Sequence, residues 1–350
     1  MSNYQLSPLA SQDLEHALNL VDKTLWEQIR GKRLLLTGGT GFVGKWILYT
    51  LAEAQQKFDL DCDVVVLTRD FESFERQLPQ LTKLNWLHFV KGDVRTFQGL
   101  DGEFQSVIHG ATDVIKKCSP IQTFDTCYAG TRNILEFAVR SGSKNFILIS
   151  SGAVYGKQPA ELVKIPEYYS GSSDFSLPES AYSIGKRSAE WISNAFFQEF
   201  EIRVVTARLF SFIGPYLALD KQFAIGNFIE SGLKGLPITI KSDGTAVRSY
   251  LYAADMAGWL WNIFFKGQAG AAYNVGSDTF FTITELAELV KQLTGTKGDI
   301  QFMGSTRKET PSERYVPDVS RVRNEFGLQK EISLHRALER TIEWYRSNNV

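Results

Sequence analysis

One stretch of the chain constrains its fold more than any other. The apolar run 34–37 leads directly into the glycine-rich segment Gly38 to Gly44, and apolar residues then recur at helical spacing. This pattern predicts a strand, a tight turn and a helix. Gly38 and Gly41 permit the sharp turn and the close approach of a ligand, and Gly44 permits the helix to pack on the strand. Glycine alone also serves purely structural turns, but this context is the one that a dinucleotide-binding motif requires.

Four more apolar segments of strand length follow, and stretches with helical periodicity separate them. Continuous apolar strands that alternate with helices are typical of a Rossmann-type, doubly wound parallel sheet in an α/β protein. Ligands bind at the carboxyl ends of the strands in such a sheet. The predicted strands, which end in polar or small residues, are 63–70, 87–94, 107–112 and 145–151.

The end of the second strand, Thr68-Arg69-Asp70, bears on the choice of cofactor. An acidic residue at this point of the fold favours NAD, whereas an arginine accommodates the 2′-phosphate of NADP. Arg69 therefore favours NADP slightly over NAD. The alternatives are that Asp70 takes the acidic role and that Arg69 is an ordinary surface charge.

Two later features carry reactive groups. Tyr182 and Lys186 are four residues apart in a helical segment that begins after Pro178, so they share one helix face. A nearby ammonium group, like an oxidised nicotinamide, favours the phenolate and would let Tyr182 act as a general base or acid. Ser151, at the end of the fifth strand, can hydrogen-bond the same substrate oxygen. A lone Tyr-x-x-x-Lys motif is weak evidence for a catalytic site, but its position after a dinucleotide-binding turn makes the motif more specific.

Composition excludes several classes of protein. The 350 residues carry a formal net charge of −1 without a basic block, which predicts no nucleic-acid partner. No apolar run approaches the ~18 residues of a membrane span, so no membrane partner is expected. The three cysteines and four histidines show no metal spacing, so we expect no metal site and a reducing, cytoplasmic environment.

The N-terminal segment carries an apolar helical stripe and lacks the features of a signal peptide. We expect an added helix with Ser11 as its N-cap that ends near Gly31. Docking of the stripe on the core is the favoured interpretation, and a subunit interface is the alternative.

Taken together, these segments resemble the extended short-chain dehydrogenase/reductases, in particular the nucleotide-sugar epimerase/dehydratase branch. The resemblance covers nearly the whole chain from Gly31 onward. The segments that carry it are 37–44, 92–94, 151–156, 182–186, 227–229, 235–240, 243–244, 248–252, Asp255 and 273–276.

The resemblance implies roles for individual residues. Ser151, Tyr182 and Lys186 correspond to the catalytic triad, and Lys186 also holds the nicotinamide ribose. Arg248 matches an arginine that contacts the substrate diphosphate, in keeping with the paired hydrogen bonds that arginine forms; a surface ion pair is its alternative role. The implied cofactor contacts are Gly38, Thr40, Gly41, Phe42, Val43, Gly44, Thr68, Arg69, Asp93, Val94, Ala111, Thr112, Tyr182 and Lys186. The implied substrate contacts are Ser151, Ser211, Asn227, Arg248 and Arg314.

Some positions depart from the family pattern. Dehydratases of the family follow the triad hydroxyl with Asp-Glu, but Gly152-Ala153 stand here and carry no proton. Sugar 4-epimerases often have a hydroxyl residue at the position of Ala153, and Ser211 replaces the usual asparagine.

The resemblance still implies an NAD(P)-dependent epimerase or oxidoreductase that transfers a hydride at a hexose carbon, with C4 favoured, of a nucleotide-diphosphate sugar. The alternatives are an NADPH-dependent 4-keto-sugar reductase, a 4,6-dehydratase, a reductase of a non-sugar ketone, and an NADP-sensing scaffold without catalysis.

The same resemblance predicts the domains and the assembly. Residues 1–30 are expected to form a helical extension. Residues 31–209 with 249–276 form the NAD(P)-binding Rossmann domain, and 210–248 with 277–350 form a smaller α/β lobe that binds the nucleotide sugar. The family is commonly dimeric, so we expect a homodimer that uses the fourth and fifth helices.

Overall fold

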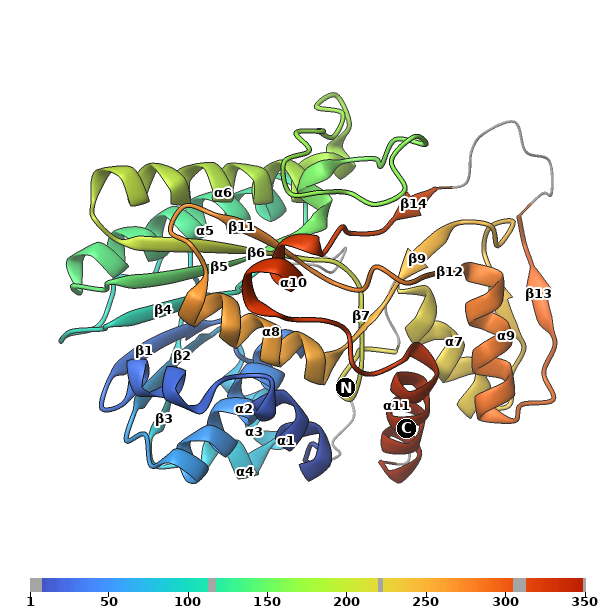
Figure 1. Ribbon diagram of the computed structural model, residues 1–350, viewed down its shortest axis with the longest axis horizontal. Coiled ribbons are helices and arrows are strands. Elements are labelled where there is room, and N and C mark those ends of the chain that lie inside the picture. The colour runs from blue at the N-terminus through green and yellow to red at the C-terminus, as the bar shows by residue number, and fades with distance from the viewer. Residues whose placement is uncertain (1–7, 113–117, 220–222, 305–312, 349–350) are drawn as a thin grey trace. The chain divides into compact units, whose positions relative to one another are not determined.

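The computed structural model describes residues 8–112, 118–219, 223–304 and 313–348. Its central feature is a seven-stranded sheet with the order β3-β2-β1-β4-β5-β6-β11 (Figure 1). The pairs from β3 to β6 are parallel. The chain runs outward in one direction through β1, β2 and β3 and in the other through β4, β5 and β6. The carboxyl ends of β1 and β4 therefore form the switch point at which such sheets bind ligands. The strands are β1 (Arg33–Thr37), β2 (Asp63–Thr68), β3 (Leu87–Lys91), β4 (Ser106–His109), β5 (Asn145–Ser151), β6 (Arg203–Leu209) and β11 (Ala272–Val275).

The predicted Rossmann-type sheet is confirmed, and the helices between its strands cover it. Apolar side chains of α5 and α6 join those of five strands in one buried cluster, so both helices cover the same face of the sheet. Alternate residues of the strands point to this face because side chains alternate along a strand. The helices between the strands are α2 (Phe42–Phe58), α3 (Phe71–Gln77), α4 (Pro79–Thr82), α5 (Pro120–Arg140) and α6 (Ala181–Glu199), with short 3-10 helices η2 (Gly152–Tyr155) and η3 (Pro178–Ser180).

The N-terminal segment forms two helices rather than the single predicted one, α1 (Ser11–Asn19) and η1 (Lys23–Ile29). The chain breaks between them because the Asp22 carboxylate accepts the Thr24 amide and starts a new helix. Ser11 is the first helical residue, and the N-cap position falls on Ala10, so the predicted cap is wrong. The apolar stripe packs on α8 (Ala253–Lys266), where the Trp26 ring lies 4.9 Å from that of Trp261.

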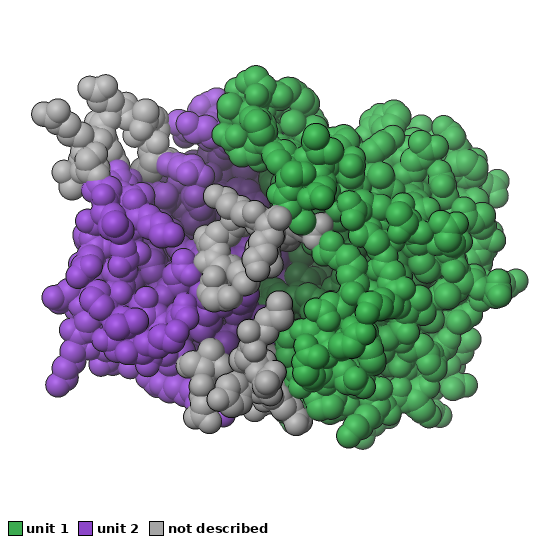
Figure 2. Space-filling view, turned by 180° about the vertical axis from the view of Figure 1, so that it is seen from behind, with its two compact units in different colours: residues 1–156, 172–209, 257–273 green, residues 157–171, 210–256, 274–350 purple. Residues whose placement is uncertain are grey.

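The chain divides into two compact units (Figure 2). Unit 1 comprises residues 1–156, 172–209 and 257–273, and unit 2 comprises 157–171, 210–256 and 274–350. Residues 249–256 and 274–276, which were predicted to belong to the Rossmann domain, cluster with unit 2, and so does the segment 157–171. The assignment of a cofactor-binding and a substrate-binding role to these parts of the chain stays a prediction.

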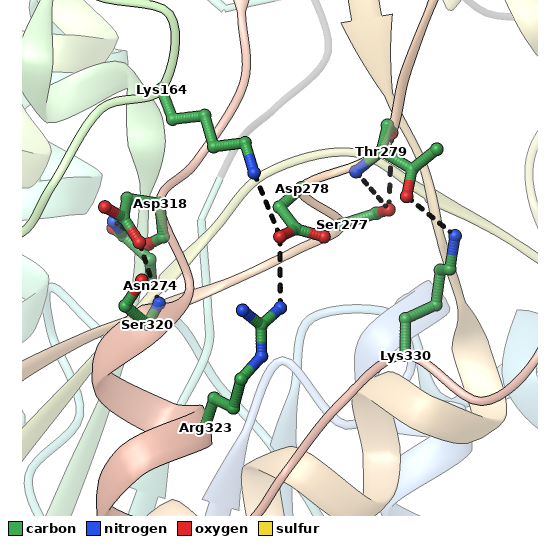
Figure 3. Close-up of polar contacts among 9 residues, drawn as sticks. All are labelled: Lys164, Asn274, Ser277, Asp278, Thr279, Asp318, Ser320, Arg323 and Lys330. Atoms are coloured by element: carbon green, nitrogen blue, oxygen red, sulfur yellow. Dashed lines mark hydrogen bonds and ion pairs between the residues drawn. The ribbon is translucent and has the colours of Figure 1, made fainter.

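Asp278 ties the segment 157–171 to the rest of unit 2 (Figure 3). Its carboxylate accepts hydrogen bonds from Lys164 and from Arg323 of α10, both at 3.0 Å. These two ion pairs lower the pKa of Asp278 against the opposing effect of burial. The elements of unit 2 are β7 (Phe212–Ile213), α7 (Ala224–Leu233), β8 (Ile238–Ile240), β9 (Val247–Ser249), β10 (Leu251–Tyr252), β12 (Phe280–Thr282), α9 (Ile283–Thr294), β13 (Ile300–Phe302), β14 (Arg314–Tyr315), α10 (Ser320–Phe326) and α11 (Leu334–Ser347).

Candidate functional site

The glycine-rich turn lies between β1 and α2, and glycine is favoured at its positions for different physical reasons. Gly38 has φ +75°, and a Cβ on it would lie 2.6 Å from the carbonyl carbon of Gly110. A Cβ on Gly44 would lie 2.3 Å from the Gly38 oxygen, so the helix packs on the turn only with glycine there. Gly41 is different, because the nearest atom to a Cβ on it would be 3.4 Å away. Internal packing therefore does not require glycine at Gly41, whereas the approach of a ligand to the backbone would.

The start of α2 provides hydrogen-bond donors beside this turn. Gly41 is the N-cap and is exposed, and no side chain caps the helix. Phe42 and Val43 follow and are partly exposed, so the first amide groups are available to an anion. The Thr40 hydroxyl lies 3.4 Å from the Thr68 hydroxyl, which links the turn to the end of β2. This arrangement fits the pyrophosphate of a dinucleotide.

At the end of β2, Thr68 is buried and Arg69 is exposed. The Asp70 carboxylate accepts the Ser73 amide at 3.0 Å and is the N-cap of α3. Its engagement in the cap gives no support to the alternative in which Asp70 reads the ribose. Asp93, beyond β3, pairs through both oxygens with Arg95, and these hydrogen bonds are the largest cause of its lowered pKa.

Val94 differs from its neighbour in being part of the hydrophobic core. Its side chain joins the buried cluster beneath α5. Its carbonyl oxygen accepts a hydrogen bond from the Asn133 amide at 2.8 Å. Any contact of Val94 with a cofactor is therefore limited to the part of this residue that the core leaves accessible.

A chain of buried hydrogen bonds fixes the adjacent ends of β1 and β4. The Thr37 hydroxyl accepts the Gly110 and Ala111 amides and therefore donates to His109 Nδ1 at 2.7 Å. His109 Nε2 lies 3.0 Å from the Thr131 hydroxyl, which donates to a backbone carbonyl and so accepts from the imidazole. Burial lowers the pKa of His109 to about 3. The neutral imidazole thus holds the backbone that leads to Ala111.

This buried histidine makes stability depend on pH. Its pKa is about 3 when folded against an ordinary 6.5, so between these values the unfolded chain binds the additional proton. We expect its contribution to reduce the free energy of unfolding by about 1.4 kcal/mol for each pH unit below about 6.5. His109→Gln should remove this contribution, as measured by urea unfolding between pH 5 and 8. The control is His335→Gln at an exposed position of α11, and an equal pH slope in wild type and His109→Gln would contradict the prediction.

Ala111 and Thr112 follow β4 directly. Ala111 is held by its amide, and the Thr112 hydroxyl lies 3.4 Å from the Cys127 sulfur on α5. Cys127 is buried and packs against α6, where a Cβ on Gly185 would come within 2.8 Å of it. The predicted lining of the cofactor groove is thus connected to the helix that bears Tyr182.

The structure brings Ser151, Tyr182 and Lys186 together within unit 1. The Ser151 hydroxyl accepts the Ala153 amide at 3.1 Å and is hydrogen-bonded to the Tyr182 phenol. Tyr182 lies in the first turn of α6 and is partly exposed. Lys186, one turn later, is buried and donates from Nζ to the Ile149 carbonyl at 2.8 Å. A phenol, a hydroxyl and an ammonium group therefore gather at the carboxyl end of β5.

The electrostatics of this cluster favour the neutral phenol of Tyr182. Burial raises the pKa of Tyr182 to about 12, and the Ser151 hydrogen bond opposes the rise only in part. The role of the Lys186 ammonium group in favouring the phenolate stays a prediction. Burial also lowers the pKa of Lys186. The neutral phenol suits proton donation, and the phenolate needs additional positive charge.

Four predicted substrate contacts lie in unit 2. The carbonyl of Ser211 accepts the Leu251 amide, and Asn227 lies in the first part of α7. Arg248 is paired through Nη2 with Glu313 at 2.8 Å. Arg314 is paired in register with Val247 rather than with Arg248, so strand alternation places the two arginines on opposite faces of their sheet.

Arg314 instead lies over the ring of Phe280, 5.6 Å from its centroid. This geometry gives no support to a joint contact of Arg248 and Arg314 with one diphosphate. The roles of Ser211, Asn227, Arg248 and Arg314 in substrate binding stay predictions.

A buried charged pair that was not predicted from the sequence lies behind the catalytic cluster. Glu190 on α6 and Arg208 on β6 are joined by three hydrogen bonds of 2.7 to 3.1 Å. One signal pointed to it, since Glu190 follows Lys186 by four residues and so shares its helix face. The position of Arg208, inside a strand, gave no such signal.

Comparison with known proteins decides the family. The profile of the NAD dependent epimerase/dehydratase family matches residues 34–276, more than half of the chain. The chain belongs to this family. UDP-glucuronic acid decarboxylase 3 of Arabidopsis thaliana is 29% identical over 317 residues, 90% of this chain and 89% of the relative. UDP-glucuronic acid decarboxylase 1 of Xenopus tropicalis is 28% identical over 90% of this chain and 72% of the relative.

Solved structures share the fold at lower identity. The dTDP-glucose 4,6-dehydratase of Bacillus anthracis, in complex with NAD, has a TM-score of 0.75 at 23% identity and covers 91% of this chain and 97% of its own. The UDP-glucose 4-epimerase of Thermotoga maritima, with UDP-glucose, has a TM-score of 0.76 at 21% identity and covers 91% and 100%. The protein is thus an enzyme of the NAD-dependent epimerase/dehydratase family.

Two other findings concern the described parts of the chain. None of the helices there is both long and apolar enough to cross a bilayer. Within the same residues, no group of three or more His, Cys, Asp or Glu side chains could hold a metal ion. All three cysteines are free thiols.

Proposed function

We propose that the protein transfers a hydride at C4 of a nucleotide-diphosphate hexose, as an NAD(P)-dependent epimerase or oxidoreductase. The observation that carries this proposal is the cluster of Ser151, Tyr182 and Lys186 at the carboxyl end of β5, in the same unit as the glycine turn. A bound nicotinamide cofactor would supply the hydride acceptor or donor and, when oxidised, a positive charge. The phenol of Tyr182 would move the proton of the C4 hydroxyl, and Ser151 would orient that oxygen.

The residues that follow Ser151 bear on the type of reaction. Gly152 and Ala153 open η2 and have no side chain that can carry a proton. Elimination of water between C5 and C6 needs an acid and a base beyond Tyr182, so 4,6-dehydration is the less favoured alternative. Epimerisation and 4-keto-sugar reduction need only the hydride and one proton, and both are compatible with this cluster.

The curated relatives favour a second candidate, decarboxylation of a UDP-linked uronic acid. Oxidation at C4 would place a ketone β to the C5 carboxylate. The bond between C5 and the carboxylate then breaks, CO₂ leaves, and the electron pair remains as an enolate that is protonated and reduced again at C4. The same hydride acceptor and the same phenol would serve this reaction. The identity of the substrate therefore decides between decarboxylation and simple hydride transfer at C4.

Three measurements test the proposal. The nucleotide released by denaturing the purified protein identifies the cofactor: tightly held NAD(H) or NADP(H) near one per chain supports recycling in place, and an empty protein that binds NADPH supports the reductase. Product analysis with UDP-glucose, UDP-galactose, dTDP-4-keto-6-deoxyglucose and UDP-glucuronate then separates epimerisation, reduction and CO₂ release. Competition by free UDP, dTDP, CDP or GDP separates these from a reductase of a non-sugar ketone. No turnover with any nucleotide sugar would contradict the proposal and leave the NADP-sensing scaffold.

We propose NADP rather than NAD as the preferred cofactor, although NAD is bound in the dehydratase neighbour. Support comes from the end of β2, where Asp70 caps α3 and Arg69 is exposed. Arg69→Ala should weaken NADP(H) binding about 10- to 100-fold, because a charge-assisted pair contributes about 1.5–3 kcal/mol. Binding of NAD(H) should change less than about twofold. Calorimetric titrations measure both, with Arg76→Ala at an exposed position of α3 as control, and equal weakening of the two cofactors would contradict the assignment.

The predicted homodimer fits the exposed apolar side chains of the two helices proposed for it. Trp191 on α6 is 67% exposed and Ile121 on α5 is 74% exposed, and these two helices pack against one another. Burial of such side chains is favourable in proportion to the apolar area removed from water. The dimer and its use of α5 and α6 belong to the proposal.

A further inference from the structure

A buried ion pair lies directly behind the proposed catalytic side chains. The Glu190 side chain is 9% exposed and that of Arg208 is 16% exposed. Arg208 Nη2 donates to Glu190 Oε2 at 2.7 Å, and Arg208 Nε lies 3.1 Å from both carboxylate oxygens. A pair this deeply buried is costly to form unless its remaining polar atoms are also satisfied.

The remaining atoms of the pair are satisfied by groups next to the catalytic cluster. The Ser150 hydroxyl donates to Glu190 Oε1 at 2.5 Å. Arg208 Nη1 donates to the Tyr155 hydroxyl at 2.8 Å, and the guanidinium lies over the same ring, 4.8 Å from its centroid. Ser150 and Arg208 are also direct neighbours in the pairing of β5 with β6. The network therefore joins α6, β5, β6 and η2.

Each of these elements carries or supports a proposed catalytic group. Ser150 precedes Ser151, and Tyr155 ends η2, of which Ser151 is the N-cap. Glu190 lies one turn beyond Lys186 on the face of α6 that points to β5. A shift of about 1 Å in such groups is enough to reduce a rate about 100-fold.

We propose that Glu190 is a positioning residue for the reaction: with Arg208 it fixes α6 against the end of β5, and it places a carboxylate on the face of α6 that carries Lys186. This inference rests on the proposed hydride transfer. It deepens that proposal by assigning a role to a charged pair that does not itself touch the reacting atoms.

The charges around Lys186 support the second part of this inference. The titratable groups that interact electrostatically with Lys186 are Glu190 of its own helix, Cys127 of α5 and His109 of β4. Burial lowers the pKa of Lys186, whereas Cys127 and Glu190 raise it. Glu190 is the carboxylate in this set, and His109 is neutral at physiological pH because its own pKa is about 3. Removal of the Glu190 charge therefore lowers the pKa of Lys186.

The test compares Glu190→Gln with the double variant Glu190→Gln/Arg208→Met. The single variant leaves the Arg208 charge buried without its carboxylate and risks unfolding, whereas the double variant removes both charges and keeps similar side-chain volumes. Both variants remove the Glu190 charge, so the Lys186 titration should move to lower pH in both. The control is Glu199→Gln, the same substitution at an exposed position at the end of α6.

Three readouts distinguish positioning from mere stability. We expect kcat to fall about 10- to 100-fold with KM nearly unchanged, and the basic limb of the pH profile to move to lower pH. The Lys186 resonance in a [¹³Cε]-lysine NMR titration, assigned with Lys186→Met, should titrate at lower pH. A folded double variant with wild-type kcat and a wild-type Lys186 titration would overturn the proposal, and so would a lower kcat without any change in that titration.

The NMR titration separates this inference from the proposed function. It needs no substrate and no turnover. If the wild type converts no nucleotide sugar, hydride transfer at C4 fails, while the coupling of Glu190 to Lys186 is still measured directly.

Discussion

Replacing Tyr182 with phenylalanine should reduce turnover by about 10³- to 10⁴-fold, near the upper end of what one proton-transfer group contributes. The ring remains, so the packing of the first turn of α6 is kept. The lost atom is the phenolic oxygen, which is hydrogen-bonded to Ser151. The two residues directly after Ser151, Gly152 and Ala153, have no side chain that could take over the proton, and the phenol of Tyr155 at the end of η2 accepts a hydrogen bond from Arg208.

The pKa of Tyr182 gives this prediction a direction with pH. Burial raises it to about 12, so the phenol is protonated at neutral pH and is ready to donate to a ketone. Removal of a proton from a C4 hydroxyl needs the phenolate, which the positive charge of an oxidised nicotinamide favours. We therefore expect oxidation to accelerate with rising pH more steeply than reduction does, and Tyr182→Phe to lose this dependence.

Stopped-flow measurement of cofactor absorbance with the nucleotide sugar tests both statements. Tyr168→Phe is the matched control, because it removes a phenolic oxygen from a side chain that is 90% exposed. Binding of the cofactor to Tyr182→Phe should remain within about threefold of wild type, which separates a chemical defect from a misfolded site. Turnover of Tyr182→Phe within tenfold of wild type would exclude the phenol as the acid or base.

The parts of this molecule that sequence predicted are those in which local pattern and tertiary structure require the same residues. A strand buried on both faces must be continuously apolar, so 63–70 and 145–151 indicated β2 and β5 within two residues. The turn at Gly38 and Gly44 could be predicted because packing at those positions excludes a Cβ. The proximity of Tyr182 and Lys186 could be predicted because a helix places residues four apart on one face.

The remainder depended on contacts between residues far apart in sequence. Glu190 and Arg208 pair across α6 and β6, and neither residue type reveals its partner. The pKa of Tyr182 follows from burial, which a sequence does not give, and the Ser151 hydrogen bond offsets the effect of burial only in part. The extent of unit 2 could not be predicted either, because the ion pair of Asp278 with Lys164 joins segments 114 residues apart in sequence.

Gly38→Ala should reduce the free energy of unfolding strongly. Among the glycine-to-alanine substitutions in the turn that do not displace α2, we expect it to have the largest effect. Gly38 has φ +75°, which costs an L-residue about 1–2 kcal/mol. Its Cβ would also lie 2.6 to 2.8 Å from backbone atoms of Gly110 and Ala111. Those atoms cannot retreat freely, because both amides donate to Thr37. Overpacking of this kind costs about 1–3 kcal/mol more.

Gly142→Ala separates the two causes. Gly142 has φ +74° but no atom within 4 Å of an added Cβ, so it measures the backbone cost alone. We expect the free energy of unfolding to fall by about 1–2 kcal/mol in Gly142→Ala and by about 2–5 kcal/mol in Gly38→Ala, measured by urea denaturation. Equal losses in the two variants would show that the end of β4 yields to the methyl group.

Gly41→Ala then distinguishes a glycine kept for the fold from one kept for a ligand. An added Cβ there makes only an ordinary contact at 3.4 Å, and φ is −80°. The free energy of unfolding should therefore change by less than about 1 kcal/mol. If the backbone at Gly41 lies against a pyrophosphate, the same methyl group should weaken NADP(H) or NAD(H) binding at least tenfold. A variant that is stable and yet binds the cofactor as wild type does would move the phosphate site away from the start of α2.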